Sequence, residues 1–92
     1  MDKITVQIRE ESAEKYIIDV VVSDGDEALT YIVDVLKNDY ERLTQGEITV
    51  EELVKRSFAF ILKREPKESI LRQFDLMVIT QYFPEYEADV GV

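Results

Sequence analysis

The residues best suited to chemistry in this chain are carboxylates, and their densest group is the segment Asp24-Gly25-Asp26-Glu27. Three carboxylates this close together could attract Ca²⁺ or Mg²⁺ weakly, but they lack the ligand spacing of an EF-hand loop. Aspartate and glycine are also the residues that tight turns prefer. We therefore interpret the segment as a hairpin turn, and we predict neither a metal site nor a cofactor.

A second candidate is the acid pair Asp19 and Asp34, which could supply a general acid and base if one pKa were raised in a shared pocket. Each lies in a predicted strand, on an exposed sheet face that offers no obvious pocket. The chain contains no histidine and no cysteine, so a triad cannot form around its serines: Ser12, Ser23, Ser57 and Ser69. Its three scattered glycines form no phosphate-binding loop. We predict that the protein is not an enzyme and has no catalytic residues.

The basic residues are unevenly distributed along the chain. Between positions 55 and 72 only Glu65 and Glu68 oppose six cations, so this segment carries +4, whereas the rest carries −13 and the net charge is −9. The six cations form a candidate basic patch: Lys55, Arg56, Lys63, Arg64, Lys67 and Arg72. Such a patch could meet an acidic partner or contact phosphates, although the acidic remainder of the chain would repel nucleic acid. The simpler interpretation is that these cations lie on solvated helix faces and balance the charge of nearby acids.

Length and composition indicate one domain spanning residues 1–92. The hydrophobic content of 46% is enough for a core, but a chain of 92 residues has little stability to spare. No apolar run approaches the roughly 18 residues needed to span a membrane, and residues 1–3 lead directly into a strand pattern without a signal peptide. We expect a cytoplasmic protein with no membrane association.

Three segments have strand patterns: residues 4–8, 16–22 and 28–36. A two-residue loop at Gly25-Asp26 places glycine where a type II′ hairpin needs it. This turn pairs position 24 with 27 and predicts four apolar pairs on one face: Val22–Leu29, Val20–Tyr31, Ile18–Val33 and Tyr16–Val35. A register shift of one residue would mix polar and apolar side chains on both faces of the hairpin. The turn and the apolar pattern therefore predict the same register. The opposite face would place Asp19 beside Ile32 and Asp34 beside Ile17.

A five-residue loop at 10–14 would add the first strand to the same sheet. It would pair Ile8 with Tyr16, and the pairing would continue with Val6–Ile18 and Ile4–Val20. The prediction is a three-stranded antiparallel meander with the second strand in the middle. Its outer face would carry an apolar centre formed by Ile17, Val21 and Ile32.

Helical patterns follow the strands, over about residues 39–45, 50–65 and 67–83. Asn38 or Asp39 could cap the first, and Thr49 with Glu52 has the spacing of a capping box for the second. The second helix carries a wide apolar arc and should end before Pro66. The segment 67–83 could be one unbroken helix or two, with Asp75 capping the second, or contain a short strand at 76–80. The acidic tail at 84–92 is expected to fray.

These elements predict an α+β fold in which three or four helices pack on one face of the meander. Residues 64–87, REPKESILRQFDLMVITQYFPEYE, resemble the C-terminal part of a group of small prokaryotic proteins of uncharacterised function. The resemblance extends upstream through Asp39-Tyr40-Glu41-Arg42-Leu43 and the central helix. It implies a small cytoplasmic prokaryotic protein, and it assigns no role to any residue.

We expect a non-enzymatic module that binds another protein or itself, and a homodimer is the form we favour. The segment 76–83 is apolar on nearly all sides, which a domain of this size can hardly cover alone. Two surfaces are candidates for the interface, and the segment 76–83 is the first choice because it has more apolar side chains. It contributes Leu76, Ile79, Tyr82 and Phe83, and the alternative, the outer sheet face, contributes Ile17, Val21 and Ile32. The alternative is a nucleic-acid-associated regulator that uses the basic segment 55–72.

Overall fold

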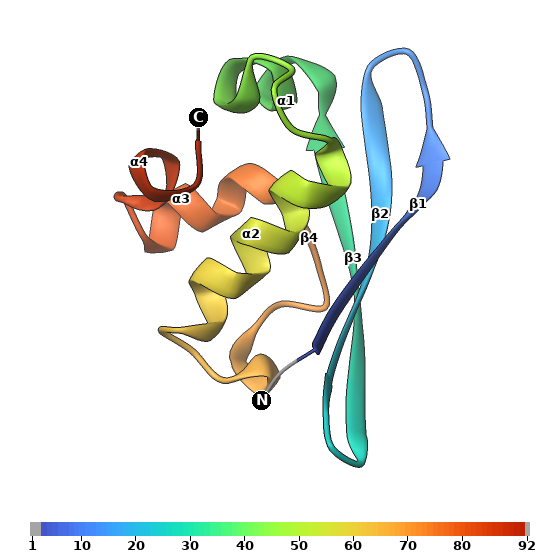
Figure 1. Ribbon diagram of the computed structural model, residues 1–92, viewed down its shortest axis with the longest axis vertical. Coiled ribbons are helices and arrows are strands. Elements are labelled where there is room, and N and C mark those ends of the chain that lie inside the picture. The colour runs from blue at the N-terminus through green and yellow to red at the C-terminus, as the bar shows by residue number, and fades with distance from the viewer. Residues whose placement is uncertain (1–2, 92) are drawn as a thin grey trace.

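The computed structural model describes residues 3–91. Residues 1, 2 and 92, the last of which ends the predicted tail, lie outside this range. The elements in chain order are β1 (Lys3–Glu11), β2 (Lys15–Asp24), β3 (Glu27–Leu36), α1 (Lys37–Thr44), α2 (Val50–Leu62), the 3₁₀ helix η1 (Lys67–Ser69), β4 (Gln73–Asp75), the 3₁₀ helix η2 (Leu76–Val78), α3 (Ile79–Tyr82) and α4 (Tyr86–Val90). The helices lie on one face of the sheet (Figure 1). This arrangement confirms the predicted α+β fold, and a fourth strand is added to the meander.

The β2–β3 hairpin has the predicted register. Asp24 pairs with Glu27, and the four apolar pairs continue from Val22–Leu29 to Tyr16–Val35. Gly25 has a φ of +65°, whereas Asp26 has no positive φ, which is the pattern of a type II′ turn. Fully buried side chains therefore line the inner face of the hairpin: Ile18, Val20, Val22, Tyr31, Val33 and Val35.

The predicted register between the first two strands is wrong by two residues. Ile8 pairs with Ile18, Val6 with Val20 and Ile4 with Val22, and a bulge separates Ile8 from Glu10. The connection is shorter than expected because Ser12 closes it: its N–H donates to the Lys15 carbonyl over 2.9 Å, and its Oγ accepts from the Lys15 N–H over 3.2 Å. Since side chains alternate between faces with a period of two, the shift keeps the apolar side chains on the inner face.

Helix α2 crosses the inner face and supplies the other half of the core. Thr49 Oγ1 accepts from the Glu52 N–H over 3.1 Å, as predicted, but the Glu52 carboxylate bonds to Arg56 rather than completing a capping box. The predicted apolar arc is buried, with Phe58 at 0% exposure and its ring centre 5.2 Å from that of Tyr31. The helix ends at Leu62 instead of residue 65, because a turn closed by hydrogen bonds to the Ile61 carbonyl precedes Pro66.

The first helix begins earlier than expected. Helix α1 follows β3 without a loop and spans Lys37–Thr44, so the residue at its N-cap is Leu36. Leu36 makes no side-chain cap hydrogen bond, and neither Asn38 nor Asp39 occupies the cap position. Gln45 and Gly46 both adopt positive φ at the other end, where the chain turns toward α2.

A continuous helix at 67–83 is wrong, and so is the alternative of a strand at 76–80, whereas Asp75 does cap a new helical turn as the remaining alternative predicted. The chain instead forms η1, the parallel strand β4, η2 and the one-turn helix α3. The open edge of β3 explains this outcome, since the N–H of Ile32 donates to the Arg72 carbonyl over 2.8 Å and Phe74 then pairs with Val33. Backbone groups at a sheet edge favour such pairing. Asp75 begins the next turn by accepting from the Met77 N–H over 2.9 Å.

The tail is also more ordered than predicted, because Tyr86 and Val90 of α4 are buried. The Tyr86 hydroxyl lies 2.6 Å from Ser57 Oγ, and Ser57 Oγ donates to the Leu53 carbonyl over 2.7 Å. Serine has one hydroxyl proton, so Tyr86 must donate to Ser57. Burial raises the pKa of Tyr86 to about 12, although the hydrogen bond to Ser57 opposes this shift.

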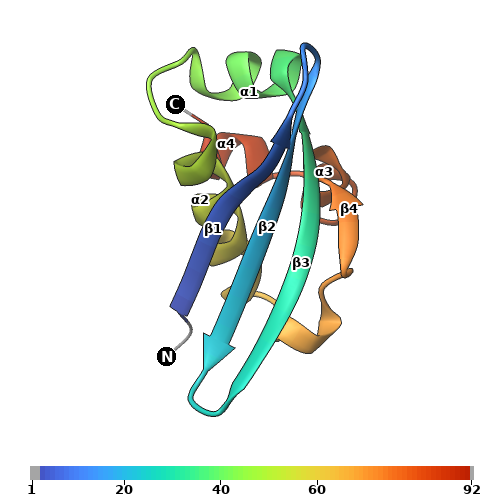
Figure 2. The same cartoon turned by 90° about the vertical axis from the view of Figure 1, so that its right-hand side faces the viewer.

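The outer face of the sheet is uncovered along the described chain (Figure 2). Ile17, Val21 and Ile32 are half-buried there. Asp19 faces Ile32, and Asp34 faces Ile17, as predicted. Each acid has its own cation: Arg9 Nε lies 2.9 Å from Asp19, and Lys15 Nζ lies 3.3 Å from Asp34.

Candidate binding groove

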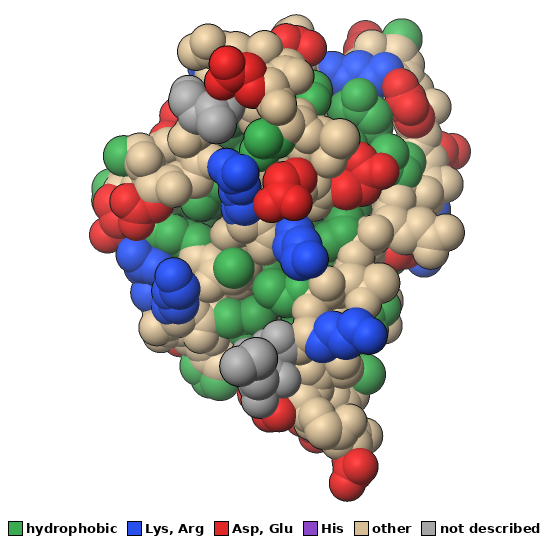
Figure 3. Space-filling view, in the orientation of Figure 1, with side chains coloured by type: hydrophobic (Ala, Val, Ile, Leu, Met, Phe, Trp, Pro, Cys, Tyr) green, Lys and Arg blue, Asp and Glu red, His purple; other side chains and the backbone are tan. Residues whose placement is uncertain are grey.

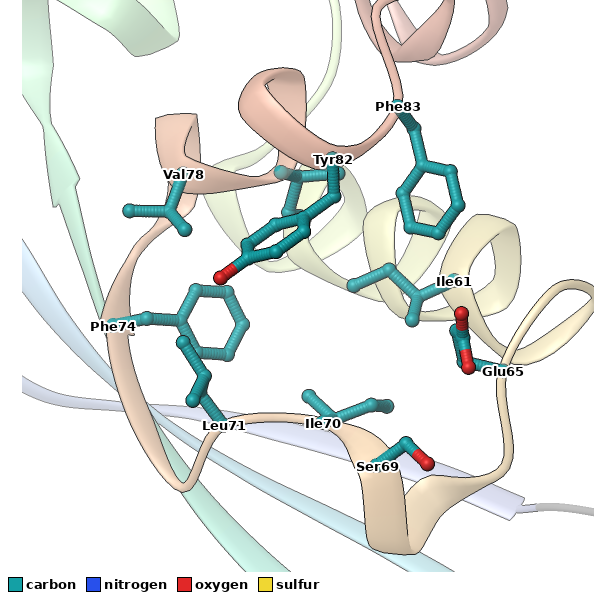
Figure 4. Close-up of a pocket in the computed structure, with 10 residues that line it drawn as sticks. Ile61, Glu65, Ser69, Ile70, Leu71, Phe74, Val78, Tyr82 and Phe83 are labelled. Carbon is teal, nitrogen blue, oxygen red and sulfur yellow. The ribbon is translucent and has the colours of Figure 1, made fainter.

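A hollow of about 300 Å³ lies between the C-terminal end of α2, the chain at 69–74 and the η2–α3 segment. We call it the apolar groove. Figure 4 shows the Tyr82 ring next to that of Phe74, with Leu71 beyond Phe74, and Glu65 and Ser69 at the far side from Val78. The groove is lined by Ile61, Glu65, Ser69, Ile70, Leu71, Phe74, Val78, Ile79, Tyr82 and Phe83. Leu71 and Tyr82 are 51% and 66% exposed, so large apolar surfaces flank the opening.

One wall of the groove is fixed by the strand pairing of β4. The parallel register with β3 aims Phe74 at the core, where its ring centre lies 6.1 Å from that of Phe58. The Asp75 cap then turns the chain, and Thr80 Oγ1 donates to the Met77 carbonyl over 2.7 Å. These bonds hold η2 and α3 in a tight turn above Phe74, which places Tyr82 over the groove.

The opposite wall is anchored to the hairpin through η1. The Tyr31 hydroxyl donates to the Lys67 carbonyl over 2.6 Å. The side chain of Lys67 is only 8% exposed, and its Nζ lies 3.1 Å from Glu27, 3.3 Å from Glu68 and 3.8 Å from Asp24. Lys67 therefore connects η1 to the end of the hairpin, and it supports the chain that carries Ser69, Ile70 and Leu71 into the groove.

The charges around Lys67 reinforce one another. The hydrogen bond to Glu27 raises the pKa of Lys67, although partial desolvation opposes the shift. The pKa of Glu68 lies below its ordinary value, because its own backbone N–H and then Lys67 donate hydrogen bonds to its carboxylate. Both shifts favour the charged forms, so this cluster is an ion-pair anchor at neutral pH.

The end of the groove at Phe83 is supported by aromatic packing. The Phe60 ring makes edge contacts with Phe83 and Tyr86, at centre distances of 5.7 and 5.5 Å. The Arg64 guanidinium lies 3.6 Å from the Phe60 ring centre and donates to the Phe60 carbonyl. Helix α4 thus contributes to the groove indirectly, because Tyr86 packs against the Phe60 ring and the Phe60 ring packs against Phe83.

The predicted interface residues fall into three groups. Leu76 and Ile79 are 0% and 4% exposed within the chain itself, so they cannot serve as protruding interface anchors, and that part of the prediction is wrong. The short turns of η2 and α3 point both side chains at the core. Tyr82 is exposed and Phe83 is half-buried at the groove. Ile17, Val21 and Ile32 lie separately, on the outer sheet face.

The six basic residues do not form the single patch that the sequence suggested. Arg56, Lys63 and Arg64 lie along a hollow between α2 and α4 that Asp89 also lines, and Arg64 is 3.4 Å from Asp89. Lys67 is enclosed by carboxylates, and the Arg72 guanidinium lies 5.8 Å from the Tyr31 ring centre. The remaining residue, Lys55, is exposed on α2. On the face in Figure 3, basic side chains are interspersed with acidic ones.

The carboxylates of the hairpin turn contact a lysine. Asp24 and Glu27 both approach Lys67 Nζ, at 3.8 and 3.1 Å. Within residues 3–91 no group of three or more histidine, cysteine or acidic residues is placed to hold a metal ion.

Several groove residues had no role in the sequence analysis. Leu71 fell within the helix predicted at 67–83, and Glu65 was counted only as a charge. An available signal was the Ile70-Leu71 pair directly after a proline-bounded turn, because adjacent side chains of an extended chain point to opposite sides. Ile70 is 9% exposed and Leu71 51%, which is the alternation that an extended segment produces.

Comparison with family models, curated proteins and solved structures finds no match to this chain. The resemblance to small prokaryotic proteins therefore stays a prediction. None of the helices in the described chain is long and apolar enough to cross a membrane.

Proposed function

We propose that this chain is a non-enzymatic protein-interaction module that binds its partner in the apolar groove. The observation that carries the proposal is the position of Leu71 and Tyr82, which are 51% and 66% exposed on either side of an apolar hollow. Exposed apolar side chains gathered around a concavity are typical of binding sites, whereas single ones scattered over a surface carry no such meaning.

The residues of the groove suit recognition better than catalysis. Its polar side chains are the Glu65 carboxylate and the Ser69 and Tyr82 hydroxyls, and the rest of the lining is aliphatic or aromatic. The sequence supplies no histidine or cysteine that could activate a hydroxyl near neutral pH. Tyrosine is a frequent anchor at protein interfaces because it adds apolar area with a polar end.

Affinity capture with matched variants tests this proposal. The groove variant carries Leu71→Ser and Tyr82→Ser, and the control carries Val21→Thr and Ile32→Thr on the outer sheet face. Both pairs of positions are solvent-accessible, and circular dichroism with urea unfolding should confirm that each variant folds. A captured protein is then identified, purified and titrated directly by calorimetry. The proposal predicts that the groove variant loses binding and the control retains it; the reverse pattern would contradict the proposal.

Self-association through the outer sheet face is a second candidate. The observation that favours it is the half-buried apolar centre of Ile17, Val21 and Ile32, which no helix covers along the described chain (Figure 2). The Arg9–Asp19 and Lys15–Asp34 pairs place both signs of charge on this face. A two-fold axis needs one self-complementary patch, and mixed charges around an apolar centre satisfy that requirement.

Light scattering at micromolar concentration tests the second candidate. A dimer should have twice the chain mass of 10.7 kDa and should dissociate when Ile17→Asp and Ile32→Asp are combined. Tyr82→Asp is the control, because Tyr82 lies at the groove, and it should leave the dimer intact. A monomer near 10.7 kDa would exclude self-association.

A further inference from the structure

Glu65 is the one residue with an ionisable carboxylate that lines the apolar groove, and it has no ion-pair or hydrogen-bond partner for its side chain within residues 3–91. The residue is exposed, and it follows the end of α2 at the side of the groove next to Ser69 (Figure 4). A carboxylate at the margin of an otherwise apolar hollow would attract a cation attached to an apolar ligand.

Of the three cations within two residues of Glu65, Lys63 lines the hollow between α2 and α4 instead of the groove. The other two have partners elsewhere. Arg64 binds the Phe60 carbonyl, stacks on the Phe60 ring and approaches Asp89. Lys67 is enclosed by Asp24, Glu27 and Glu68. Neither lines the groove, so the Glu65 carboxylate gives its margin a negative charge. This charge favours an occupant that carries a positive charge.

The size of the groove limits what can fill it. Its volume of about 300 Å³ lies at the lower end of the range of ligand pockets. A pocket of this size accepts one or two large side chains. A stable interface between folded proteins buries about 800 Å² on each partner, which requires a much broader surface. A second copy placed groove to groove fits poorly as well, since the lining of its groove offers no cation to place against Glu65.

We propose that the groove recognises a short linear segment of a partner protein that presents an aliphatic or aromatic side chain next to a lysine or arginine. This inference rests on the proposed function and adds the chemistry of the partner. The apolar side chain enters between Leu71, Phe74 and Tyr82, and the adjacent cation lies against Glu65. The acidic net charge of −9 would also favour the approach of a basic segment.

The test is a selection from a library of random twelve-residue peptides on the immobilised protein. Fluorescence anisotropy with labelled synthetic peptides then measures affinity for the wild-type chain, Glu65→Gln and the control Glu51→Gln. Glu51 is an exposed acid at the other end of α2, so the control changes the net charge equally. Selected peptides should share an apolar residue beside Lys or Arg. Glu65→Gln should weaken them about two- to fivefold, as expected for an exposed ion pair, and Glu51→Gln should not.

A double-mutant cycle locates the contact. Replacing the cation of the peptide by glutamine should weaken binding to the wild-type chain about two- to fivefold, and should have no further effect on Glu65→Gln. Peptides that depend on Leu71 and Tyr82 but ignore charge would overturn the inference and leave the proposed function standing. The absence of any peptide sensitive to Leu71→Ser and Tyr82→Ser would overturn both. Binding of small aryl-alkyl amines without binding of peptides would also overturn the inference, because the occupant would then be a small molecule.

Discussion

Tyr86 and Ser57 form a buried hydrogen bond. Because Tyr86 is its donor, removing the donor and removing the acceptor should cost different amounts of stability. Ser57 donates its proton to the Leu53 carbonyl, so Tyr86 is the donor to Ser57 Oγ. Tyr86→Phe removes that donor and leaves the bond from Ser57 to Leu53 intact, which should lower the free energy of unfolding by about 0.5–1.5 kcal/mol. Ser57→Ala leaves the Tyr86 hydroxyl, in a residue that is 0% exposed, without its acceptor, which should cost about 1–3 kcal/mol.

Urea unfolding of the two single variants and the double variant measures these costs. The m-value should stay constant while the midpoint moves, because the same surface unfolds in each variant. The double variant should lose less than the sum of the single variants, with a coupling of about 1 kcal/mol. Additive losses would refute the hydrogen bond between Tyr86 and Ser57, and a Tyr86→Phe variant less stable than Ser57→Ala would refute the assigned donor direction.

Two further variants and the pH dependence of Tyr86→Phe test the fold. Gly25→Val should cost more than about 1 kcal/mol in urea unfolding because φ is +65° and a β-branched side chain resists that conformation; a neutral result would contradict the turn. Phe58→Ala should cost about 3–5 kcal/mol, since Phe58 is completely buried, and a loss below 1 kcal/mol would contradict its central position. Tyr86 ionises near pH 10 when unfolded and near 12 when folded, so its native form loses about 2–3 kcal/mol of stability between those values. The stability deficit of Tyr86→Phe should therefore vanish at about pH 11 and change sign toward pH 12, and a constant deficit would contradict the pKa shift.

The hairpin and the core were predictable because two independent signals agreed there. The glycine at position 25 set the turn, and the apolar pairs from Tyr16 to Val22 allowed only one register. The Thr49 cap and the spacing of Phe58 and its neighbours similarly determined α2. In each of these elements the local chemistry and the burial pattern point to the same structure.

The segment after Pro66 was not predictable in the same way, because its structure depends on a distant partner. The Ile32 N–H at the edge of β3 donates to the Arg72 carbonyl, and Phe74 then pairs with Val33 in a parallel strand. No local residue signals this pairing. The groove is a consequence of that strand, since a continuous helix would have had no hollow between Leu71 and Tyr82. The ion-pair cluster at Lys67 was hidden for the same reason: its acids come from positions 24 and 27.

The most direct test of the groove as a binding surface is a titration of the methyl-labelled chain with the strongest selected peptide, followed by ¹³C NMR. Isoleucine, leucine and valine methyls report separately on the two candidate surfaces. The groove predicts shift changes concentrated at Ile61, Ile70, Leu71, Val78 and Ile79, with unchanged signals at Ile17, Val21 and Ile32. Changes concentrated at Ile17, Val21 and Ile32, or an unchanged spectrum at saturating peptide, would contradict the assignment of the apolar groove as the binding surface.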